Sequence, residues 1–245
     1  YMSSGPGEQE LGTDELKACL DMLSRMGVFH VALGGGEAFE RDDFAEIVTH
    51  CRRVGIVPNL TTNGQNIGAR EAQICRQMGQ VNVSVDGVGE RYAVNGRAGS
   101  FERVDRAIDT LKRTGVPVGV NCVVSRRNFD HLPDLIAWAA GRGLNEIEFL
   151  KYKPSGRGAA HYDEHALTQE MIRSLYPTLM EQARRWSTEL KVDCSFVPAL
   201  CYHRPPREDL EKLAVTGCDG GNLLLGVGSN GTFCACSFVT NNEPV

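Results

Sequence analysis

Strand-like segments alternate with helix-like segments along more than half of this chain, and this alternation constrains the fold most strongly. The strand segments are apolar and rich in β-branched residues, and the helix segments have apolar residues at helical spacing. The predicted strands are residues 28–33, 56–60, 81–85, 116–124 and 146–150, and the predicted helices are residues 13–26, 42–54, 69–78, 101–114 and 132–142. Strands joined through helices run parallel, because each crossover returns the chain to the same edge of the sheet in the same direction. The pattern therefore predicts an α/β fold with a parallel barrel or partial barrel.

The pattern changes after residue 151. A loop rich in glycine and proline precedes a long helical segment at 168–187, and a region rich in cysteine, glycine and proline follows it. We therefore expect a barrel over residues 1–160, a helical linker over 161–200 and a small Cys-rich C-terminal extension over 201–245.

The composition argues against several classes of partner and compartment. The 245 residues carry a net charge of −5, which gives no general attraction for nucleic acid or for an anionic membrane. No run of 18 apolar residues occurs, so no membrane span is predicted. The nine cysteines are odd in number and scattered, unlike a disulfide framework. Reduced thiols favour a cytoplasmic protein.

Polar residues follow the predicted strands at their carboxyl ends, where parallel sheets bind ligands. Three adjacent glycines expose backbone hydrogen-bonding groups, and Glu37 adds a carboxylate suited to an ammonium group. Taken singly, these residues are also typical of turns and helix caps, and Lys151 is typical of an ordinary basic loop. Their shared placement predicts one polar ligand across the mouth of the barrel. The candidates are Gly34, Gly35, Gly36, Glu37, Thr62, Asn63, Ser84, Asp86, Asn121 and Lys151.

These segments resemble the motifs of the radical S-adenosylmethionine (SAM) superfamily. Its Gly-Gly-Glu, Thr-Asn-Gly and Ser-x-Asp-Gly motifs, which follow the second, third and fourth strands of the family fold, are matched by residues 35–37, 62–64 and 84–87. Residues 99–108 also resemble the helix that follows the fourth strand. The resemblance covers about residues 11–158, and it implies a partial parallel (β/α)6 barrel.

The resemblance also implies the chemistry. In this family a [4Fe–4S] cluster reduces bound SAM to a 5′-deoxyadenosyl radical, which abstracts a hydrogen atom from the substrate. The family's glycines and glutamate hold the methionyl amino group of SAM, and its strand-four serine with nearby polar groups holds the carboxylate or the ribose. These roles fall on Gly35, Gly36, Glu37 and Ser84. No catalytic acid, base or radical donor is assigned.

The sequence departs from the family in one major respect, because the three-cysteine cluster loop, Cys-x3-Cys-x2-Cys, does not occur in it. The first residues, Tyr1-Met2-Ser3-Ser4, are neither a signal peptide nor a natural start, and they resemble the run that follows this loop. We therefore expect the [4Fe–4S] ligands upstream of Tyr1. Smaller departures are Ala38, where the family often has proline, and Asn95, where related sequences often place an arginine.

Cysteines crowd near the C-terminus at a second recognisable spacing. Cys218 is followed by twelve residues, Gly231, four residues and Cys236, with Asn230-Gly231 as a turn between two short strands. This spacing resembles the start of the SPASM or twitch extension, whose cysteines hold auxiliary iron–sulfur clusters. The candidate ligands are Cys218, Cys236, Cys234 and Cys201. A zinc site is the alternative, made by Cys201, His203, Cys218 and either Cys234 or Cys236.

The function expected from these features is that of a radical SAM enzyme with an auxiliary cluster, and such enzymes commonly modify ribosomally made peptides. The expected partners are a peptide or small-molecule substrate and a reductant such as flavodoxin or ferredoxin, with neither nucleic acid nor membrane. Three alternatives remain open at this point. They are a radical SAM enzyme acting on a small molecule or tetrapyrrole, a catalytically dead partner subunit that keeps the barrel, and a zinc-containing binding module.

Overall fold

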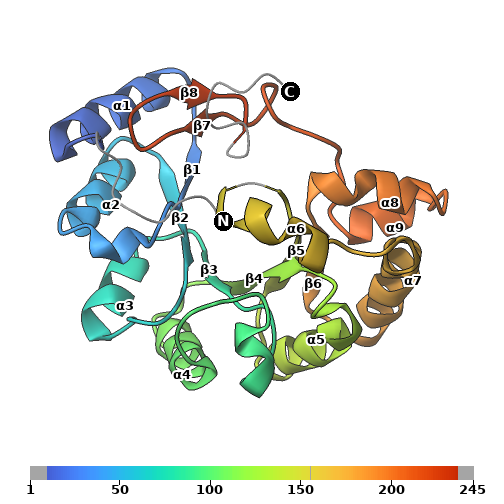
Figure 1. The fold of residues 1–245 in the computed structure, drawn as a ribbon. Helices are drawn as coiled ribbons and strands as arrows, with labels where there is room; N and C mark the ends of the chain where they lie inside the picture. Colours follow the sequence, from blue (N-terminus) through green and yellow to red (C-terminus); the bar gives the residue numbers. More distant parts are fainter. Residues whose placement is uncertain (1–9, 155, 237–245) are drawn as a thin grey trace.

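A curved sheet of six parallel strands forms the centre of the molecule in the computed structural model, which describes residues 10–154 and 156–236 (Figure 1). The strands lie side by side in chain order, so each new strand is added at the same edge. Their bounds are β1 (His30–Leu33), β2 (Val57–Thr62), β3 (Val81–Ser84), β4 (Val118–Val124), β5 (Glu146–Lys151) and β6 (Glu189–Val192). Because β1 and β6 do not pair with each other among the described residues, the sheet is an open, partial barrel.

Helices cover the outer face of this sheet (Figure 1). They are α1 (Thr13–Arg25), α2 (Phe44–Arg53), α3 (Ala69–Cys75), α4 (Phe101–Lys112), α5 (Leu132–Gly141) and α7 (Gln169–Arg185). Alternate residues of the strands, such as Val83, Val120 and Phe149, are fully buried in the core beneath the helices. The other alternate residues face the inside of the barrel, and there they are mostly polar. The predicted parallel α/β architecture is confirmed.

Local chemistry explains where the helices begin. The Ser100 hydroxyl accepts a hydrogen bond from the Arg103 N–H and caps α4, and Thr168 caps α7 in the same way through Met171. Gly12 is the N-cap of the first helix. The Glu15 carboxylate accepts the Gly12 N–H at 2.8 Å and satisfies the helix end.

The segment 161–200 contains a strand that the sequence did not reveal. It supplies the expected long helix as α7, and it then adds β6, which pairs with β5 through Glu146↔Glu189 and Phe149↔Val192. The strand has only four residues, with lysine and glutamate among them, so its local pattern is weak. Beyond it lie two short helices, α8 (Val197–Cys201) and α9 (Arg207–Lys212).

The C-terminal extension folds back beside the first helix and strand (Figure 1). The strands β7 (Gly226–Val227) and β8 (Phe233–Cys234) form an antiparallel hairpin, as the Asn230-Gly231 turn predicted. Gly231 has a φ of 82°, which favours glycine. The Leu11 N–H donates to the Ser229 carbonyl at 2.8 Å, so the two ends of the described chain are joined.

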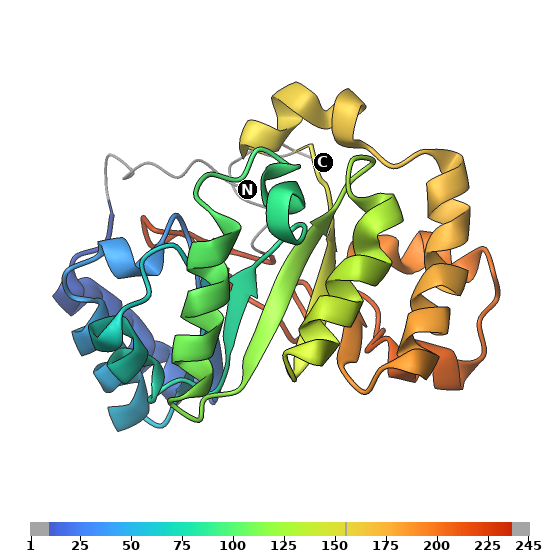
Figure 2. The ribbon, with the colours of Figure 1, turned by 90° about the horizontal axis from the view of Figure 1, so that it is seen from below.

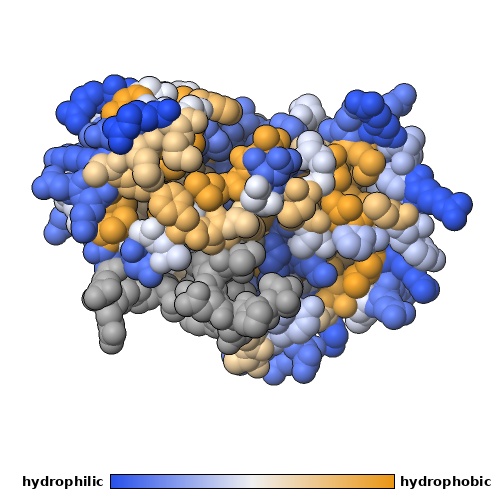
Figure 3. All heavy atoms as spheres, turned by 90° about the horizontal axis from the view of Figure 1, so that it is seen from above, coloured by the Kyte–Doolittle hydropathy of each residue, from blue (hydrophilic) through white to orange (hydrophobic). Residues whose placement is uncertain are grey.

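The hairpin side of the molecule has an apolar surface (Figure 3). Leu223, Leu224 and Phe233 are exposed on the C-terminal extension. No helix in the described part of the chain is both long enough and apolar enough to cross a membrane.

Candidate functional site

The glycine run leaves an open stretch of backbone at the carboxyl end of β1. Gly34 and Gly35 are exposed, and a side chain added at either would meet no atom within 4 Å. Gly35 has a φ of +138°, so a residue with a side chain would be strained there. Backbone N–H and C=O groups at this loop are therefore reachable by a ligand.

Glu37 fastens this loop to the end of β2. The Thr62 hydroxyl donates to Glu37 Oε1 and the Asn63 N–H donates to Oε2, each at 2.8 Å. Burial raises the pKa of Glu37, although these hydrogen bonds and one from the Phe39 backbone act to lower it. A carboxylate has about four acceptor sites, so these three hydrogen bonds leave capacity for an ammonium group.

The turn after β2 requires glycine at one position. Gly64 has a φ of +70°, and an added Cβ would lie 2.7 Å from Val83 Cγ1. The Gly64 N–H donates to the Thr62 hydroxyl, and the Gln65 N–H donates to the Asn63 side chain. The Thr-Asn-Gly sequence thus forms a compact turn that presents Asn63 beside the glycine loop.

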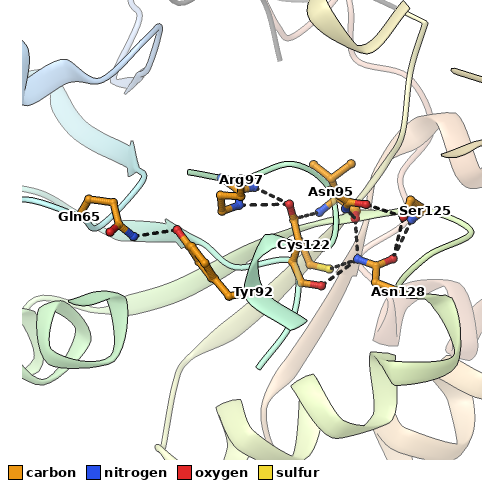
Figure 4. Close-up of polar contacts among 9 residues, drawn as sticks. Gln65, Tyr92, Asn95, Arg97, Cys122, Ser125 and Asn128 are labelled. Atoms are coloured by element: carbon orange, nitrogen blue, oxygen red, sulfur yellow. Dashed lines mark hydrogen bonds and ion pairs between the residues drawn. The ribbon is translucent and has the colours of Figure 1, made fainter. Parts of the chain in front are cut away.

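Asp86 takes part in a buried polar network at the end of β3. Figure 4 shows Arg97, Asn95, Ser125 and Asn128 of this network. Asp86 Oδ2 accepts from Arg97 Nε at 3.1 Å and from Arg97 Nη2 at 2.8 Å, while Oδ1 accepts from the Val123 N–H. The side chains of Asp86 and Arg97 are 3% and 17% exposed. Although burial acts to lower it, the pKa of Arg97 is raised by Asp86. Asp86 therefore positions Arg97 and the end of β4.

Asn95 belongs to the same network. Its Nδ2 donates to the Val123 carbonyl, and its Oδ1 accepts from the Ser125 hydroxyl at 2.6 Å (Figure 4). The residue that departs from the family pattern is thus used internally, and the guanidinium of this turn comes from Arg97, two residues along the chain.

Ser84 and Asn121 share one row across the inside of the barrel. The strand register pairs Ser84 with Asn121, Asn121 with Glu148, and Glu148 with Lys191. Directly paired residues point to the same face of a sheet. Asn121 Oδ1 accepts from Asn82 Nδ2 at 2.8 Å, whereas no described residue hydrogen-bonds the Ser84 hydroxyl. We call Ser84, Asn121, Glu148 and Lys191 the inner row.

Lys151 does not join the inner row. It lines a cavity of about 260 Å³ together with residues of α7 and α8 such as Ile172 and Pro198. In β5 it therefore lies on the face that packs against the helices, opposite Glu148. The structure brings the glycine loop, Glu37, Thr62 and Asn63 together and aligns Ser84 with Asn121, and it separates Lys151 from them.

The C-terminal cysteines converge only in part. A Cβ added at Gly220 would lie 3.5 Å from Cys218 Sγ and 3.4 Å from Cys236 Cβ, so these two cysteines flank one glycine. Cys194, which was not among the candidates, contacts Cys218. Desolvation, Asp193 and Cys218 raise the pKa of Cys194 to about 11. The exposed Cys201 lies at the end of α8, and Cys234 lies in β8.

The alternative zinc site is not formed by the described side chains. His203 packs against α7 with its ring centroid 5.1 Å from that of Tyr176, and its Nε2 lies 2.5 Å from the Arg173 carbonyl oxygen. Within residues 10–154 and 156–236, no three His, Cys, Asp or Glu side chains stand close enough together for one metal ion. The run Tyr1–Ser4, which resembles the end of the cluster loop, lies outside the described residues.

The described residues are chemically suited to bind SAM. An open glycine backbone, a carboxylate with spare acceptor capacity and an unpaired serine hydroxyl lie at the carboxyl ends of adjacent parallel strands, and they are suited to an amino acid and a ribose. The thiols beside Gly220 are the donor type that iron–sulfur clusters use.

Comparisons with known proteins identify the family and the fold. The radical SAM superfamily is matched by residues 1–139. The mycofactocin maturase MftC of Mycolicibacterium smegmatis is 35% identical over 189 residues, which are 75% of this chain and 48% of that protein. The AdoMet-dependent heme synthase of Methanosarcina barkeri is 27% identical over 247 residues, covering 94% of this chain and 69% of that protein. The chain thus spans about half of the length of this MftC.

A solved structure shows the same fold. SuiB of Streptococcus suis, bound to its precursor peptide SuiA, superposes with a TM-score of 0.75 at 14% identity, covering 99% of this chain and 57% of SuiB. The parallel partial barrel is the fold of radical SAM proteins. This chain belongs to the radical SAM superfamily, whose members bind SAM and a [4Fe–4S] cluster.

Three residues near the site were not predicted from the sequence. Glu148, Arg97 and Cys194 gain their positions from partners that are distant in sequence, namely Asn121, Asp86 and Cys218. The one local signal was the alternation of glutamate with apolar residues in β5, which places Glu146 and Glu148 on the inner face.

Proposed function

We propose that this chain is the core of a radical SAM enzyme that modifies a ribosomally made peptide. The observation that carries the proposal is the open glycine loop, held by Glu37 against Thr62 and Asn63 at the mouth of the barrel. Similarity to a peptide maturase, and to the fold of an enzyme seen with its precursor peptide, supports the peptide substrate.

The chain's own residues have separate tasks in this proposal. Bound SAM and a reduced cluster supply the radical that abstracts a substrate hydrogen atom. Glu37 and the glycine backbone orient the methionyl ammonium group, and Ser84 donates to the carboxylate or the ribose. Asp86 holds Arg97 in place at the edge of this site. Lys151 lies on the other face of β5, so its proposed cofactor contact depends on a displacement of that side chain.

We propose further that Cys218 and Cys236, with Cys194 beside them, hold an auxiliary iron–sulfur cluster. Cys218 and Cys236 flank Gly220, and Cys194 contacts Cys218, although the three residues come from separate segments. Cys234 and Cys201 remain secondary candidates. We propose that a flavodoxin or ferredoxin reduces the enzyme in the cytoplasm, where thiols stay reduced.

Similarity to a heme synthase favours a second candidate, a radical SAM enzyme that acts on a tetrapyrrole. The two candidates share the SAM site and differ in the group that enters the barrel. A chain that kept the barrel but lost the cluster would be a partner subunit with neither activity.

The test is iron and sulfide analysis of the anaerobic full-length protein, followed by chromatography for 5′-deoxyadenosine after adding dithionite and SAM. About eight irons per chain together with 5′-deoxyadenosine are expected for two [4Fe–4S] clusters. Zinc or no metal, with no 5′-deoxyadenosine, would overturn the enzymatic proposal.

A further inference from the structure

Three carboxylates and two lysines line the inside of the barrel where β5 meets β6. Glu146 pairs with Lys191 at 2.5 Å and also accepts from Asn82 Nδ2 at 3.1 Å. Asp193 pairs with Lys153 at 2.5 Å and accepts the Ser195 N–H. Glu148 receives no hydrogen bond or ion pair from the described residues. One negative charge in this group therefore has no direct partner.

Glu148 faces the same space as the proposed SAM residues. Its strand neighbours Ile147 and Phe149 are fully buried beneath the helices, so alternation turns Glu148 to the inner face. There it stands between Asn121 and Lys191 in the inner row, one strand further along than the Ser84–Asn121 pair. The residue is half-buried, so its carboxylate is reachable from inside the barrel.

Packing explains why the neighbouring lysine does not neutralise Glu148. Gly119 has no side chain, and an added Cβ there would lie 2.5 Å from Asn82 Oδ1 and 2.7 Å from Glu146 Cγ. This gap lets Asn82 reach Glu146 across β4, and the same carboxylate then holds Lys191. Lys191 is thereby directed to Glu146 and away from Glu148.

The electrostatic setting of Glu148 favours a cation. Burial, followed by the charges of Glu146 and Asp193, raises the pKa of Glu148, and Lys191 and Lys153 only partly offset these effects. A neutral ligand would leave the carboxylate uncompensated, whereas an ammonium or guanidinium group would balance the third charge.

We propose that Glu148 is a specificity-determining residue that binds the cationic side chain of a lysine or arginine in the substrate, beside the SAM site. The proposal rests on the proposed function and deepens it, because it names the chemical class of the residue that enters the barrel. A competing role for Glu148, as an acceptor for the ribose hydroxyls of the cofactor or as the counter-ion of its sulfonium, is separable by experiment.

The experiment uses the anaerobic full-length protein with its iron content measured and SAM present. Two probes, N-acetyl-lysine methylamide and the corresponding norleucine amide, which lacks the ammonium group, are titrated by saturation-transfer NMR. We expect the wild type to bind the lysine probe about tenfold more tightly, the scale of one charge-assisted hydrogen bond. The variant Glu148→Gln is expected to bind both probes alike. Glu189→Gln is the matched control, since Glu189 lies 3.9 Å from the same Lys191 but is exposed.

Two results would overturn the proposal. One is an equal affinity of the wild type for both probes, or a lysine preference that survives in Glu148→Gln. The other is a loss of SAM affinity in Glu148→Gln at unchanged lysine preference, which would assign the residue to the cofactor. The measured melting temperature of each variant separates these results from a failure to fold. Failure of the proposed function would show instead as wild-type protein without iron or 5′-deoxyadenosine formation.

Discussion

Asp86 Oδ2 accepts two hydrogen bonds from the guanidinium of Arg97, at 3.1 and 2.8 Å. Because Asp86 Oδ1 also accepts from the Val123 N–H, this pair ties the loop between β3 and α4 to the end of β4. Breaking a buried pair leaves an uncompensated charge, so Asp86→Asn is expected to lower the free energy of unfolding by about 3 kcal/mol. Urea denaturation of the wild type and the variant measures this loss of stability. The control is Asp134→Asn, which removes the exposed Arg91 pair at 3.5 Å and is expected to cost less than about 1 kcal/mol. Equal losses of stability in the two variants would show that the buried Asp86–Arg97 pair contributes no more than an exposed pair.

Glu37 supplies the second prediction, which concerns cofactor affinity. Glu37→Ala is expected to weaken SAM binding by about 1.5–3 kcal/mol, because the ammonium group loses a charge-assisted hydrogen bond. Isothermal titration with SAM measures the change. Glu40→Ala, an exposed carboxylate in the same turn, should leave the affinity unchanged. An unaltered affinity in Glu37→Ala would remove Glu37 from the site.

Gly64 tests the geometry of the turn beside this glutamate. Gly64→Ala places a methyl group 2.7 Å from Val83 Cγ1 at a φ of +70°, so both strain and overlap are expected to destabilise the fold by about 3 kcal/mol. Gly55→Ala shares the positive φ, +82°, but meets nothing within 4 Å, and about 1 kcal/mol is expected. Thermal unfolding of both variants measures the difference, and similar melting temperatures would contradict the close packing of Gly64 on β3.

The raised pKa of Glu148 contributes to the pH dependence of stability. Because this pKa is raised, the folded protein holds the Glu148 proton more tightly than the unfolded chain does. The contribution of Glu148 to stability is therefore greatest below its ordinary pKa of 4.5 and is lost as pH rises through the raised value. Denaturation of Glu148→Gln and the wild type is measured at several pH values. As pH rises, the free energy of unfolding of the variant should increase relative to that of the wild type. A constant difference across that range would contradict the raised pKa.

The cysteines are tested by metal content. Replacing Cys218 or Cys236 with Ser should lower iron per chain and leave the cluster of the SAM site in place, because in our proposal the thiolates near Gly220 hold the auxiliary cluster. Cys19→Ser, a partly buried cysteine in α1 outside the candidate ligands, is the control and should keep the full iron content. Iron that stays constant in all three variants would contradict the auxiliary cluster.

The strand-end motifs were predictable because their information is local. Gly35-Gly36-Glu37 and Thr62-Asn63-Gly64 follow short apolar strands, and the structure joins them through the Glu37 hydrogen bonds. The strand β6 was not predictable from its four mixed residues, because its pairing with β5 stabilises it. Likewise, the position of Lys151 at a strand end was predictable, but the face of the sheet on which it lies was not. That face follows from the register that pairs Glu148 with Asn121 on the inner side.

The hydrogen bond from Leu11 to the Ser229 carbonyl joins segments more than two hundred residues apart in the sequence. Closing so long a loop has a large entropic cost, which the chain recovers only when both partners are already folded. The hairpin that carries Cys234 is therefore expected to dock only after the segment around Leu11 has folded. If the auxiliary cluster assembles on the docked hairpin, its assembly follows the folding of the barrel. Iron that is supplied before this step encounters cysteines that are still far apart.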